Sequence, residues 1–481
     1  MIQLRPILFI LGMLLCVLAA AMLLPAAIDI ADSNADWMVF FAASLVAFFS
    51  GGLLLLVNYD EQPVQLGLKE GFALTTASWI MIPAFAAIPF VGLGLGYTDS
   101  FFEAMSGITT TGATVLSGLD KLPRGILLWR ALLNWIGGIG IIVMAMVILP
   151  FLSVGGMQLF HSESSDRDDK VLPRAIELVT ASAKVYLVFS LSCAAIYALL
   201  GMSFFDAICH AMATLATGGF STHDESLGFF KSPGIEWAAT FFMTMGGLPF
   251  VLFIKLAHGD RTPFWRDAQV RGLLVFLLGV TLVMTLWLSS TRSLPLGEAL
   301  RLTAFHVTSI VTTTGFATAN YQLWGPFAVG VFFILTYVGG CAGSTSGGIK
   351  IYRLQIAAII TRRHLQQLIS PHRIIPLSYN GRRLPADVPF SVVAFLVIYM
   401  GSVGIIAVAL SAMGLDMVTA ISSAATAISS VGPGLGPIVG PDGNFASLPA
   451  AAKWLLAFAM MLGRLELFTV LVLLRPEFWR S

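Results

Sequence analysis

The stretch Gly107-Ile108-Thr109-Thr110-Thr111-Gly112-Ala113-Thr114 decides the fold, because three more versions of it follow along the chain. Each version is a short run of Thr, Ser and Gly in an apolar background. The other three are Leu215-Ala216-Thr217-Gly218-Gly219-Phe220, Val311-Thr312-Thr313-Thr314-Gly315-Phe316 and Ile428-Ser429-Ser430-Val431-Gly432-Pro433. Aligned on Gly112, Gly218, Gly315 and Gly432, the versions are spaced by roughly a hundred residues, which indicates an internal repeat.

The surroundings of the four loops repeat as well. Each loop follows a stretch of about twelve residues that is too short to cross a membrane and mostly helix-forming, at 99–109, 205–216, 302–312 and 416–428. One long apolar run lies before each short stretch and another lies after each loop. The repeating unit is therefore a span, a short helix, a polar loop and a second span.

Composition places this unit in a membrane. Of the 481 residues, 57% are hydrophobic and only 11% are charged, whereas a soluble domain has roughly 25% charged residues. Nine apolar runs have about the length of a transmembrane helix, at 7–29, 38–57, 72–95, 127–152, 180–201, 235–256, 272–290, 388–412 and 450–474. A tenth, at 324–360, is interrupted by Gly339, Gly340, Gly343, Gly347 and Gly348.

The distribution of charge predicts an orientation. Most Lys and Arg residues fall in the segments that are cytoplasmic if the N-terminus is inside, so both termini are expected in the cytoplasm. The first run also resembles a signal peptide, with Arg5 before it and Pro25-Ala26-Ala27 after it. A retained helix is the preferred interpretation, because the run is long and a second span follows at once. The net charge of +1 argues against a nucleic acid partner.

A non-helical loop at membrane depth is tolerated where it lines protein or water. Four such loops around one axis form a ring whose backbone carbonyls can replace the hydration shell of a cation. Glycine permits the backbone conformations that this arrangement needs, and the short helices direct their negative dipole ends at the ion. An isolated TTTG is usually an ordinary turn, but four copies in one context favour a pore.

These motifs resemble the four filter loops of the membrane subunits of bacterial Trk potassium-uptake systems, of the TrkH/TrkG type. The Gly-rich segment from Gly339 to Lys350 resembles the intramembrane gating loop of that family. The resemblance covers essentially the whole chain, and the two additional N-terminal spans match the Trk branch.

The resemblance implies an all-α integral membrane protein in which four tandem span–pore helix–filter loop–span repeats surround a pseudo-fourfold pore, with two extra N-terminal spans. It implies potassium as the transported ion, with no cofactor in this chain. It also implies a homodimer in the bacterial inner membrane and a cytosolic TrkA-type subunit that binds the regulatory nucleotide. The repeats are expected at 66–155, 156–260, 261–370 and 371–481, after an N-terminal extension at 1–65.

The family's ion-coordinating positions are backbone carbonyls at and just before each filter glycine. Carried over to this sequence, the expected potassium-binding residues are Thr110, Thr111, Gly112, Ala216, Thr217, Gly218, Thr313, Thr314, Gly315, Ser430, Val431 and Gly432. Glycine at all four aligned positions favours potassium over sodium. The fourth loop departs most from TTTG, so a less selective potassium/sodium path remains an alternative.

The Gly-rich loop is expected to gate the pore, since five glycines in ten residues cannot hold a straight helix well. Close helix packing is the competing interpretation. Lys350 either repels cations below the filter or extends to the lipid headgroups. Arg464 lies in the last span, where a charge is costly and usually functional. It either donates to carbonyls of the Gly-rich loop, which the family supports, or pairs with Glu466.

Other ionisable residues lie in or near the short helices. Glu103 is a candidate for attracting cations or for bracing the filter. Asp206, like Asp99 and Asp416, is interpreted first as a helix N-cap. His210 and His306 would suit a proton-coupled potassium symporter. The preferred interpretation is that both histidines bond to local backbone.

The basic stretch 350–385 is expected in the cytoplasm, where it suits either anionic lipid or a regulatory subunit. An ion-translocating subunit of an ATP-driven pump would be longer, and a transporter of organic solutes would show inverted repeats. The sequence has no phosphate-binding loop, HExxH motif or plausible catalytic triad, which argues against an enzyme. Its four cysteines form no CxxC pair and are interpreted as buried small side chains.

Overall fold

Long apolar helices dominate the computed structural model, which describes residues 3–60, 67–144, 171–260, 262–373 and 375–480. Within these ranges, seven helical segments are long and apolar enough to cross a membrane. They are α1 (Leu4–Ala31), α2 (Trp37–Asn58), α3 with α4 (Leu68–Ala86 and Ile88–Gly92), α6 (Arg124–Val143), α9 (Val171–Leu199), α14 (Ala268–Arg292) and α18 (Asp387–Ala412).

Two further spans are bent. The helix pair α11 (Pro233–Gly246) and α12 (Phe250–Ala257) turns by 95°, and the pair α21 (Ala450–Arg464) and α22 with η6 (Phe468–Leu471 and Val472–Leu474) turns by 107°. All nine predicted runs therefore correspond to helical segments, although residues 145–152 of the fourth run lie outside the described part. The sequence indicated a break only at 324–360, so the bends within 235–256 and 450–474 were not predicted.

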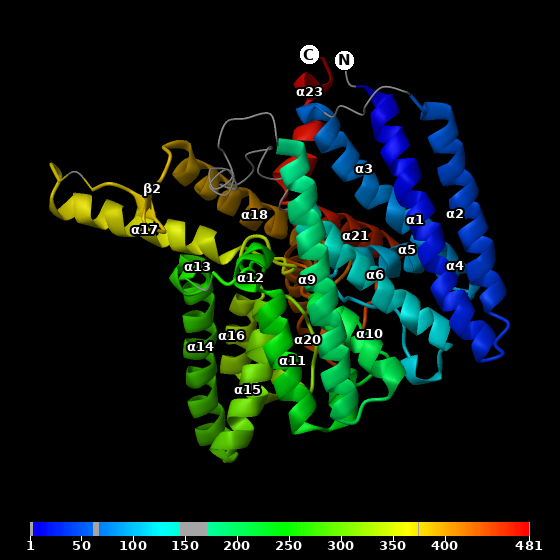
Figure 1. Ribbon diagram of the computed structural model, residues 1–481. Coiled ribbons are helices and arrows are strands. Elements are labelled where there is room, and N and C mark those ends of the chain that lie inside the picture. Colours follow the sequence, from blue (N-terminus) through cyan, green and yellow to red (C-terminus); the bar gives the residue numbers. More distant parts are fainter. Residues whose placement is uncertain (1–2, 61–66, 145–170, 261, 374, 481) are drawn as a thin grey trace.

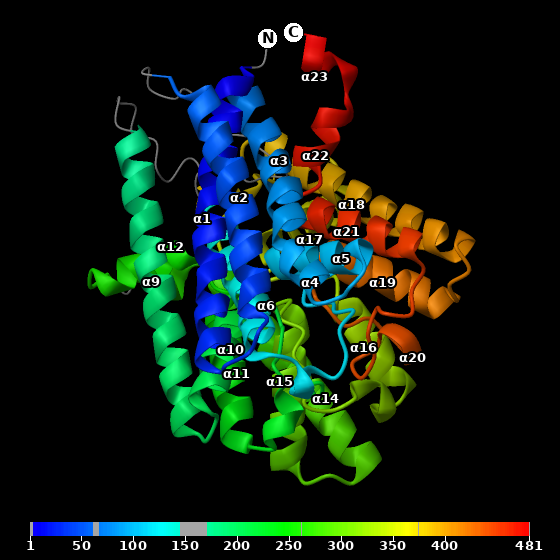
Figure 2. The same cartoon turned by 90° about the vertical axis from the view of Figure 1, so that its right-hand side faces the viewer.

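Each unit of the chain contains a short helix between two spans. The short helices are α5 (Tyr97–Ile108), α10 (Phe204–Leu215), α15 (Leu296–Val311) and α19 (Met417–Ser429). They lie close to the predicted positions, with α15 beginning earlier than expected. Figure 2 shows α5 beside α4 and α21, and α5 also contacts α3 and α6. Short connections complete the units, including η1 (Leu119–Lys121), η4 (Ser226–Phe230), η5 (Tyr321–Trp324) and α20 (Gly436–Val439).

The first two helices form a tightly packed pair. A Cβ atom on Gly51 would lie 2.7 Å from the carbonyl oxygen of Gly12, so glycine at both positions lets α1 and α2 approach closely. The buried carboxylate of Asp29, near the end of α1, accepts a hydrogen bond of 2.8 Å from the backbone N–H of Gly125. Helix α1 therefore packs against both α2 and the first turn of α6, and its retention stays a prediction.

The predicted tenth span is interrupted as expected. Helix α16 (Pro326–Leu335) ends, and residues 339–350 follow without helix before α17 (Ile351–Ile369) begins. Figure 1 shows α17 projecting sideways from the body, on the half of the molecule that carries both chain termini. A small antiparallel hairpin, β1 (Ser378–Tyr379) and β2 (Arg382–Arg383), follows it. Among the described residues, the remaining short helices are α13 (Thr262–Arg266) and α23 (Pro476–Arg480).

Large apolar side chains are exposed along the outer helices. On α14 these include Val275, Leu278, Leu282 and Leu286, and on α18 they include Phe390, Val397 and Ile405. A protein in water rarely exposes such continuous apolar faces, so these helices suit contact with lipid.

The first turns of the short helices correct two predicted N-caps. Asp416 caps α19 by accepting from the backbone N–H of Thr419 at 3.1 Å, as predicted. The N-cap of α10 is Ser203, whose hydroxyl accepts from the N–H of Asp206, so the prediction for Asp206 was wrong. The prediction for Asp99 was also wrong, because this carboxylate lies within the first turn of α5 and pairs with Lys453 at 2.6 Å.

Replacing Ser203 with Ala should lower the free energy of unfolding by about 1 kcal/mol, because one N–H of α10 would lose its acceptor. The measurement is the apparent melting temperature of the purified protein in detergent. Ser192→Ala is the matched control, since Ser192 is exposed within α9 and caps no helix. The same drop in the control variant would contradict the capping role.

Candidate functional site

The four short helices end in the same way. In three of them the second residue past the helix has a left-handed backbone, namely Thr110, Thr217 and Thr313 with φ of 51°, 49° and 57°. In the fourth it is the first residue past α19, Ser430, with φ of 57°. The next N–H bonds back by five residues, as in Thr111 N to Ser106 O at 2.9 Å and Thr314 N to Ser309 O at 2.8 Å. This pair of features is a Schellman motif, here with Thr or Ser where glycine is usual.

A glycine with positive φ follows two residues later in every loop. These glycines are Gly112, Gly219, Gly315 and Gly432, with φ of 81°, 71°, 80° and 102°. The second loop therefore differs by one residue from the sequence alignment, which used Gly218. Because α10 ends at Leu215 and Thr217 takes the left-handed position, Gly219 is the residue equivalent to Gly112.

The four loops form a closed ring. A Cβ atom on Gly112 would lie 2.3 Å from the carbonyl oxygen of Gly218 in the second loop. The same test links the second loop to the third, the third to the fourth and the fourth back to the first. A Cβ atom would lie 2.0 Å from Thr314 O if placed on Gly219, 2.0 Å from Val431 O if placed on Gly315 and 2.7 Å from Thr111 O if placed on Gly432.

This ring can hold a cation without any charged ligand. The residue before each glycine places its carbonyl oxygen against the neighbouring loop, and all four helices direct their C-terminal ends towards the ring. Among the described residues, no group of three or more His, Cys, Asp or Glu side chains could hold a metal ion. The ring instead offers backbone oxygens, which suit an ion that has to be bound and released.

A buried ion pair braces the first loop from behind. Arg130 on α6 and Glu103 on α5 lie 2.8 Å apart, with 1% and 0% of their side chains exposed. Glu103 also accepts from the hydroxyl of Thr114 and, at 2.9 Å, from the N–H of Val115. Of the two predicted roles for Glu103, its complete burial fits bracing and excludes direct contact with ions at the mouth.

The Gly-rich loop lies directly against one side of the ring. The hydroxyl of Thr313 accepts from the N–H of Gly347 at 2.6 Å, and the hydroxyl of Thr217 lies 3.2 Å from that of Thr345. A Cβ atom on Gly347 would lie 2.4 Å from the carbonyl oxygen of Ser429. The loop thus contacts the second, third and fourth loops of the ring at once, on the side from which α17 leaves.

Two cationic side chains hold this loop. Arg464 Nη1 donates to the carbonyl oxygen of Thr345 at 2.9 Å, which is the first of the two arrangements considered from the sequence. Lys350 Nζ donates to the carbonyl oxygen of Ser346, and the residue is only 7% exposed. Lys350 therefore does not extend to the membrane surface.

Comparison with known proteins agrees with this architecture. The family model described as "TrkH: Cation transport protein" matches residues 37–481. The chain belongs to the TrkH family. This is a family of multi-pass membrane transporters and not of enzymes.

Curated TrkH-family relatives cover nearly the whole chain. A Trk system potassium uptake protein TrkI of Halomonas elongata is 47% identical over 480 residues, which is 99% of this chain and 97% of the relative. The TrkH protein of Escherichia coli is 36% identical, covering 99% of both chains. The crystal structure of the potassium transporter TrkH from Vibrio parahaemolyticus matches with a TM-score of 0.92 and 33% identity, covering 100% of both chains.

In this TrkH-family chain, Glu466 has a partner that sequence spacing did not suggest. Its carboxylate lies 2.5 Å from the guanidinium of Arg353 on α17, and the Arg353 side chain is fully buried over the ring of Phe395. Glu466 and Leu467 both have positive φ, at 59° and 51°, where the last span bends. The ion pair connects this bend to α17, which starts where the Gly-rich loop ends.

The basic stretch 350–385 divides into two parts. Lys350 and Arg353 are buried beside the Gly-rich loop, so neither side chain is available to anionic lipid or to a regulatory subunit. The other basic residues are exposed or partly exposed on α17 and the hairpin, and they include Arg362, Arg382 and Arg383.

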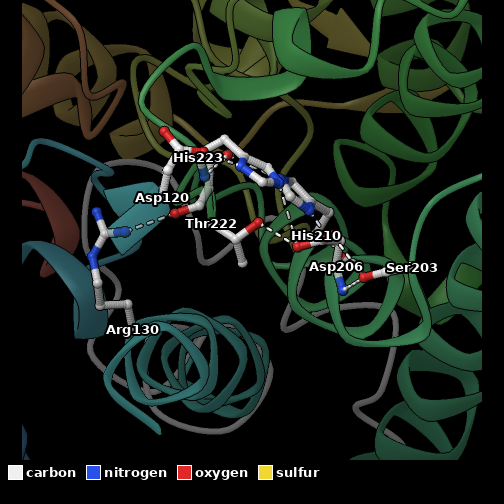
Figure 3. A network of polar contacts seen from close by, with 8 residues as sticks. Asp120, Arg130, Ser203, Asp206, His210, Thr222 and His223 are labelled. Atoms are coloured by element: carbon white, nitrogen blue, oxygen red, sulfur yellow. Dashed lines mark hydrogen bonds and ion pairs between the residues drawn. The ribbon is translucent and has the colours of Figure 1, made fainter. Parts of the chain in front are cut away.

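Both histidines of the short helices are fully buried and bonded. Nδ1 of His210 and of His306 contacts a carbonyl oxygen one turn earlier at 2.8 Å, as the preferred interpretation predicts. The sequence did not single out His223, which lies between Asp120 and Asp206 (Figure 3). The sequence feature that could have identified His223 is its position just after the second loop.

Proposed function

We propose that this protein mediates potassium uptake across the bacterial inner membrane. The ring of four loops serves as the selectivity filter of a pseudo-fourfold pore. The observation that carries the proposal is the closed ring itself, in which each glycine faces a carbonyl oxygen of the next loop. Uncharged oxygens at the ends of four converging helices suit a dehydrated monovalent cation. The relatives named as potassium uptake proteins and the potassium transporter support this choice of ion.

The corrected register changes the proposed ligands in one loop. The proposed binding residues are Thr110, Thr111 and Gly112 in the first loop, Thr313, Thr314 and Gly315 in the third, and Ser430, Val431 and Gly432 in the fourth. In the second loop, Thr217, Gly218 and Gly219 replace the set that began at Ala216. Potassium is the transported substrate in this proposal, and the chain itself holds no cofactor.

The Gly-rich loop is the proposed gate, with Gly339, Gly340, Gly343, Gly347, Gly348, Lys350 and Arg464 as its functional residues. Its contacts with three of the four ring loops support a blocking position. The exposed basic residues of α17 suit a cytosolic nucleotide-binding subunit of the TrkA type, which would act on the gate through the Arg353–Glu466 pair. A homodimer with cytoplasmic termini, in contact with membrane lipid, completes the proposal.

The proposed repeats are those of the sequence, at 66–155, 156–260, 261–370 and 371–481, after the extension at 1–65. Each contains one span, one short helix, one ring loop and one further span. The boundaries at 65/66 and 155/156 lie outside the described residues.

A less selective potassium/sodium path is the second candidate function. The observation that favours it is the fourth loop, whose Gly432 has φ of 102°. A Cβ atom on Gly432 would lie 2.7 Å from the first loop, whereas at the other three glycines the corresponding distance is 2.0–2.3 Å. A ring with one wider contact holds its carbonyl oxygens less uniformly. Proton-coupled symport has less support, because His210 and His306 are both bonded within their own repeats.

Cation flux in proteoliposomes tests these alternatives. Purified protein is compared for uptake of potassium, rubidium, caesium, sodium and lithium, with and without a pH gradient, and protein-free vesicles are the control. We expect potassium and rubidium uptake well above sodium uptake, independent of a gradient that is imposed at a constant pH on the side of the ring mouth. Equal sodium and potassium uptake would favour the second candidate, and dependence on the gradient would favour symport.

A further inference from the structure

A cluster of titratable side chains lies apart from the proposed potassium ligands and the proposed gate. Its centre is His223, which lies four residues after Gly219 on the side of the ring opposite the Gly-rich loop. His223 lines the hollow at the mouth of the ring, together with Gly219, Phe220 and Ser221. Its side chain is 14% exposed, so it is largely enclosed but within reach of water.

His223 contacts two carboxylates from different parts of the chain. Nδ1 forms a short contact with Asp120, in the segment that follows the first ring loop, and Nε2 lies 3.5 Å from Asp206 in the first turn of α10. Figure 3 shows the imidazole between these two side chains. The ring of Phe229 stacks on the imidazole at a centroid distance of 3.6 Å and an interplanar angle of 8°, which fixes its orientation.

Two further hydrogen bonds join residues next to His223 to the first repeat. The backbone N–H of Leu119 donates to Asp224 at 3.1 Å, and Arg130 Nη1 donates to the carbonyl oxygen of Ser221 at 2.7 Å. On one side of His223, Asp224 is thus bonded to the segment after the first loop, and on the other side Ser221 is bonded to α6. Because each segment continues directly into the ring, this attachment bears on the position of both loops.

With Nδ1 bonded to Asp120, only the imidazolium form also carries a proton on Nε2, which faces Asp206 at 3.5 Å as an ion pair without a hydrogen bond. Burial alone would lower the pKa of His223, but Asp206 and Asp120 more than offset this and raise it above its ordinary value of 6.5. The hydrogen bond from His223 lowers the pKa of Asp120. The stabilisation is therefore complete below pH 6.5 and is lost as pH rises through the raised pKa of His223.

The other charged groups around His223 do not replace this contact. From α10, His210 stacks at a centroid distance of 6.4 Å and uses its own nitrogens for Asp206 O and Ser221 Oγ. From α6, Arg130 is committed to Glu103 and Ser221. On the same segment, Asp224 accepts from Leu119.

We propose that His223 is a positioning residue whose protonation ties the segment after the first ring loop to α10, so that pH at the mouth sets the potassium-over-sodium preference. This inference rests on the proposed function of the ring. At low pH the imidazolium holds both loops in register. At higher pH the neutral ring can donate to one carboxylate only, the attachment loosens and the preference falls.

The test sets the pH on the two sides of proteoliposomes separately. Orientation is determined by tryptic cleavage at the exposed Arg362 of α17 and at Arg382 and Arg383 of the hairpin. The rubidium-to-sodium uptake ratio is measured with the pH at the ring mouth between 6 and 9. We expect the wild-type ratio to fall about two- to fivefold as pH rises, the order of effect of one partly exposed ion pair. His223→Gln should remove the step and keep the lower ratio throughout.

Two comparisons make the result specific. His258→Gln, at the far end of α12 and on the opposite side of the ring, should retain the wild-type step. Asp120→Asn removes one carboxylate partner and should move the step to lower pH, which tests the inference even if His223→Gln does not fold. An unmoved step in Asp120→Asn, or an unchanged step in His223→Gln, would overturn the proposal.

Wild-type behaviour separates this inference from the proposed function. Cation flux with a ratio that stays constant from pH 6 to 9 would overturn the role of His223 and leave the transport function intact. Absence of cation flux at every pH would overturn the proposed function, and the inference with it.

Discussion

Replacing Gly112 with Ser is expected to reduce the potassium-over-sodium preference of uptake about tenfold or more. The new Cβ atom would lie 2.3 Å from the carbonyl oxygen of Gly218, a separation that forces the first and second loops apart. The residue would also keep φ near 81°, where a side chain costs about 1–3 kcal/mol, and 1.4 kcal/mol corresponds to a factor of ten. The measurement is the ratio of rubidium to sodium uptake in proteoliposomes.

Gly414→Ser is the matched control for this experiment. Gly414 has φ of 94°, and a Cβ atom there would meet nothing within 4 Å, because the residue is exposed beyond the end of α18. The control carries the same backbone strain without the contact in the ring, so its uptake ratio should stay at the wild-type value. An unchanged ratio in Gly112→Ser would remove the first loop from the proposed filter.

The spans and the short helices could be predicted from the sequence because their signals are local. A run of about 20 apolar residues and a twelve-residue helical stretch need no knowledge of distant contacts. The interruption at 339–350 was predicted for the same reason, since clustered glycines weaken a helix wherever it lies. These local features were enough to predict where the four ring loops and the Gly-rich loop lie along the chain.

The two bends were not predicted because the average hydropathy of an apolar run does not indicate whether the helix axis changes direction within it. The turn between α11 and α12 follows Gly246-Gly247-Leu248-Pro249, and this breaker signal was present in the sequence. The turn after Arg464 has no such signal. It depends on contacts to Thr345 and Arg353 that lie more than a hundred residues away, so spacing along the chain cannot indicate it.

The register of the second loop shows a different limit. Gly218 and Gly219 are adjacent, and either could align with Gly112 by sequence alone. The end of α10 at Leu215 decides between them, because the Schellman geometry counts from the last helical residue. His223 escaped prediction for the same reason as the turn after Arg464, since its partner Asp120 is 103 positions away.

The ring and the Gly-rich loop share a direct mechanical link. Thr217, Thr313 and Ser430 are the left-handed residues of three ring loops, and each contacts Thr345, Ser346 or Gly347. A movement of the Gly-rich loop therefore removes contacts from the ring itself. Opening of the proposed gate is accordingly expected to depend on how firmly the loop is held from the other side.

Replacing Arg464 with Gln is expected to raise basal potassium flux about tenfold in the absence of a regulatory subunit. The guanidinium donates to Thr345 O at 2.9 Å from a residue that is 3% exposed. A hydrogen bond to a charged group contributes about 1.5–3 kcal/mol, which corresponds to a factor of ten or more in the ratio of held to released loop. The measurement is rubidium uptake by the purified protein alone.

Arg475→Gln is the matched control, since Arg475 is exposed beyond the last span and should leave basal flux unchanged. Arg464→Lys keeps the charge but loses the planar fork of donors, so its flux should lie between wild type and Arg464→Gln. This graded order distinguishes a lost contact to the loop from general damage, because damage would reduce flux in both variants. Basal flux at the wild-type level in Arg464→Gln would mean that the contact with Thr345 does not hold the gate closed.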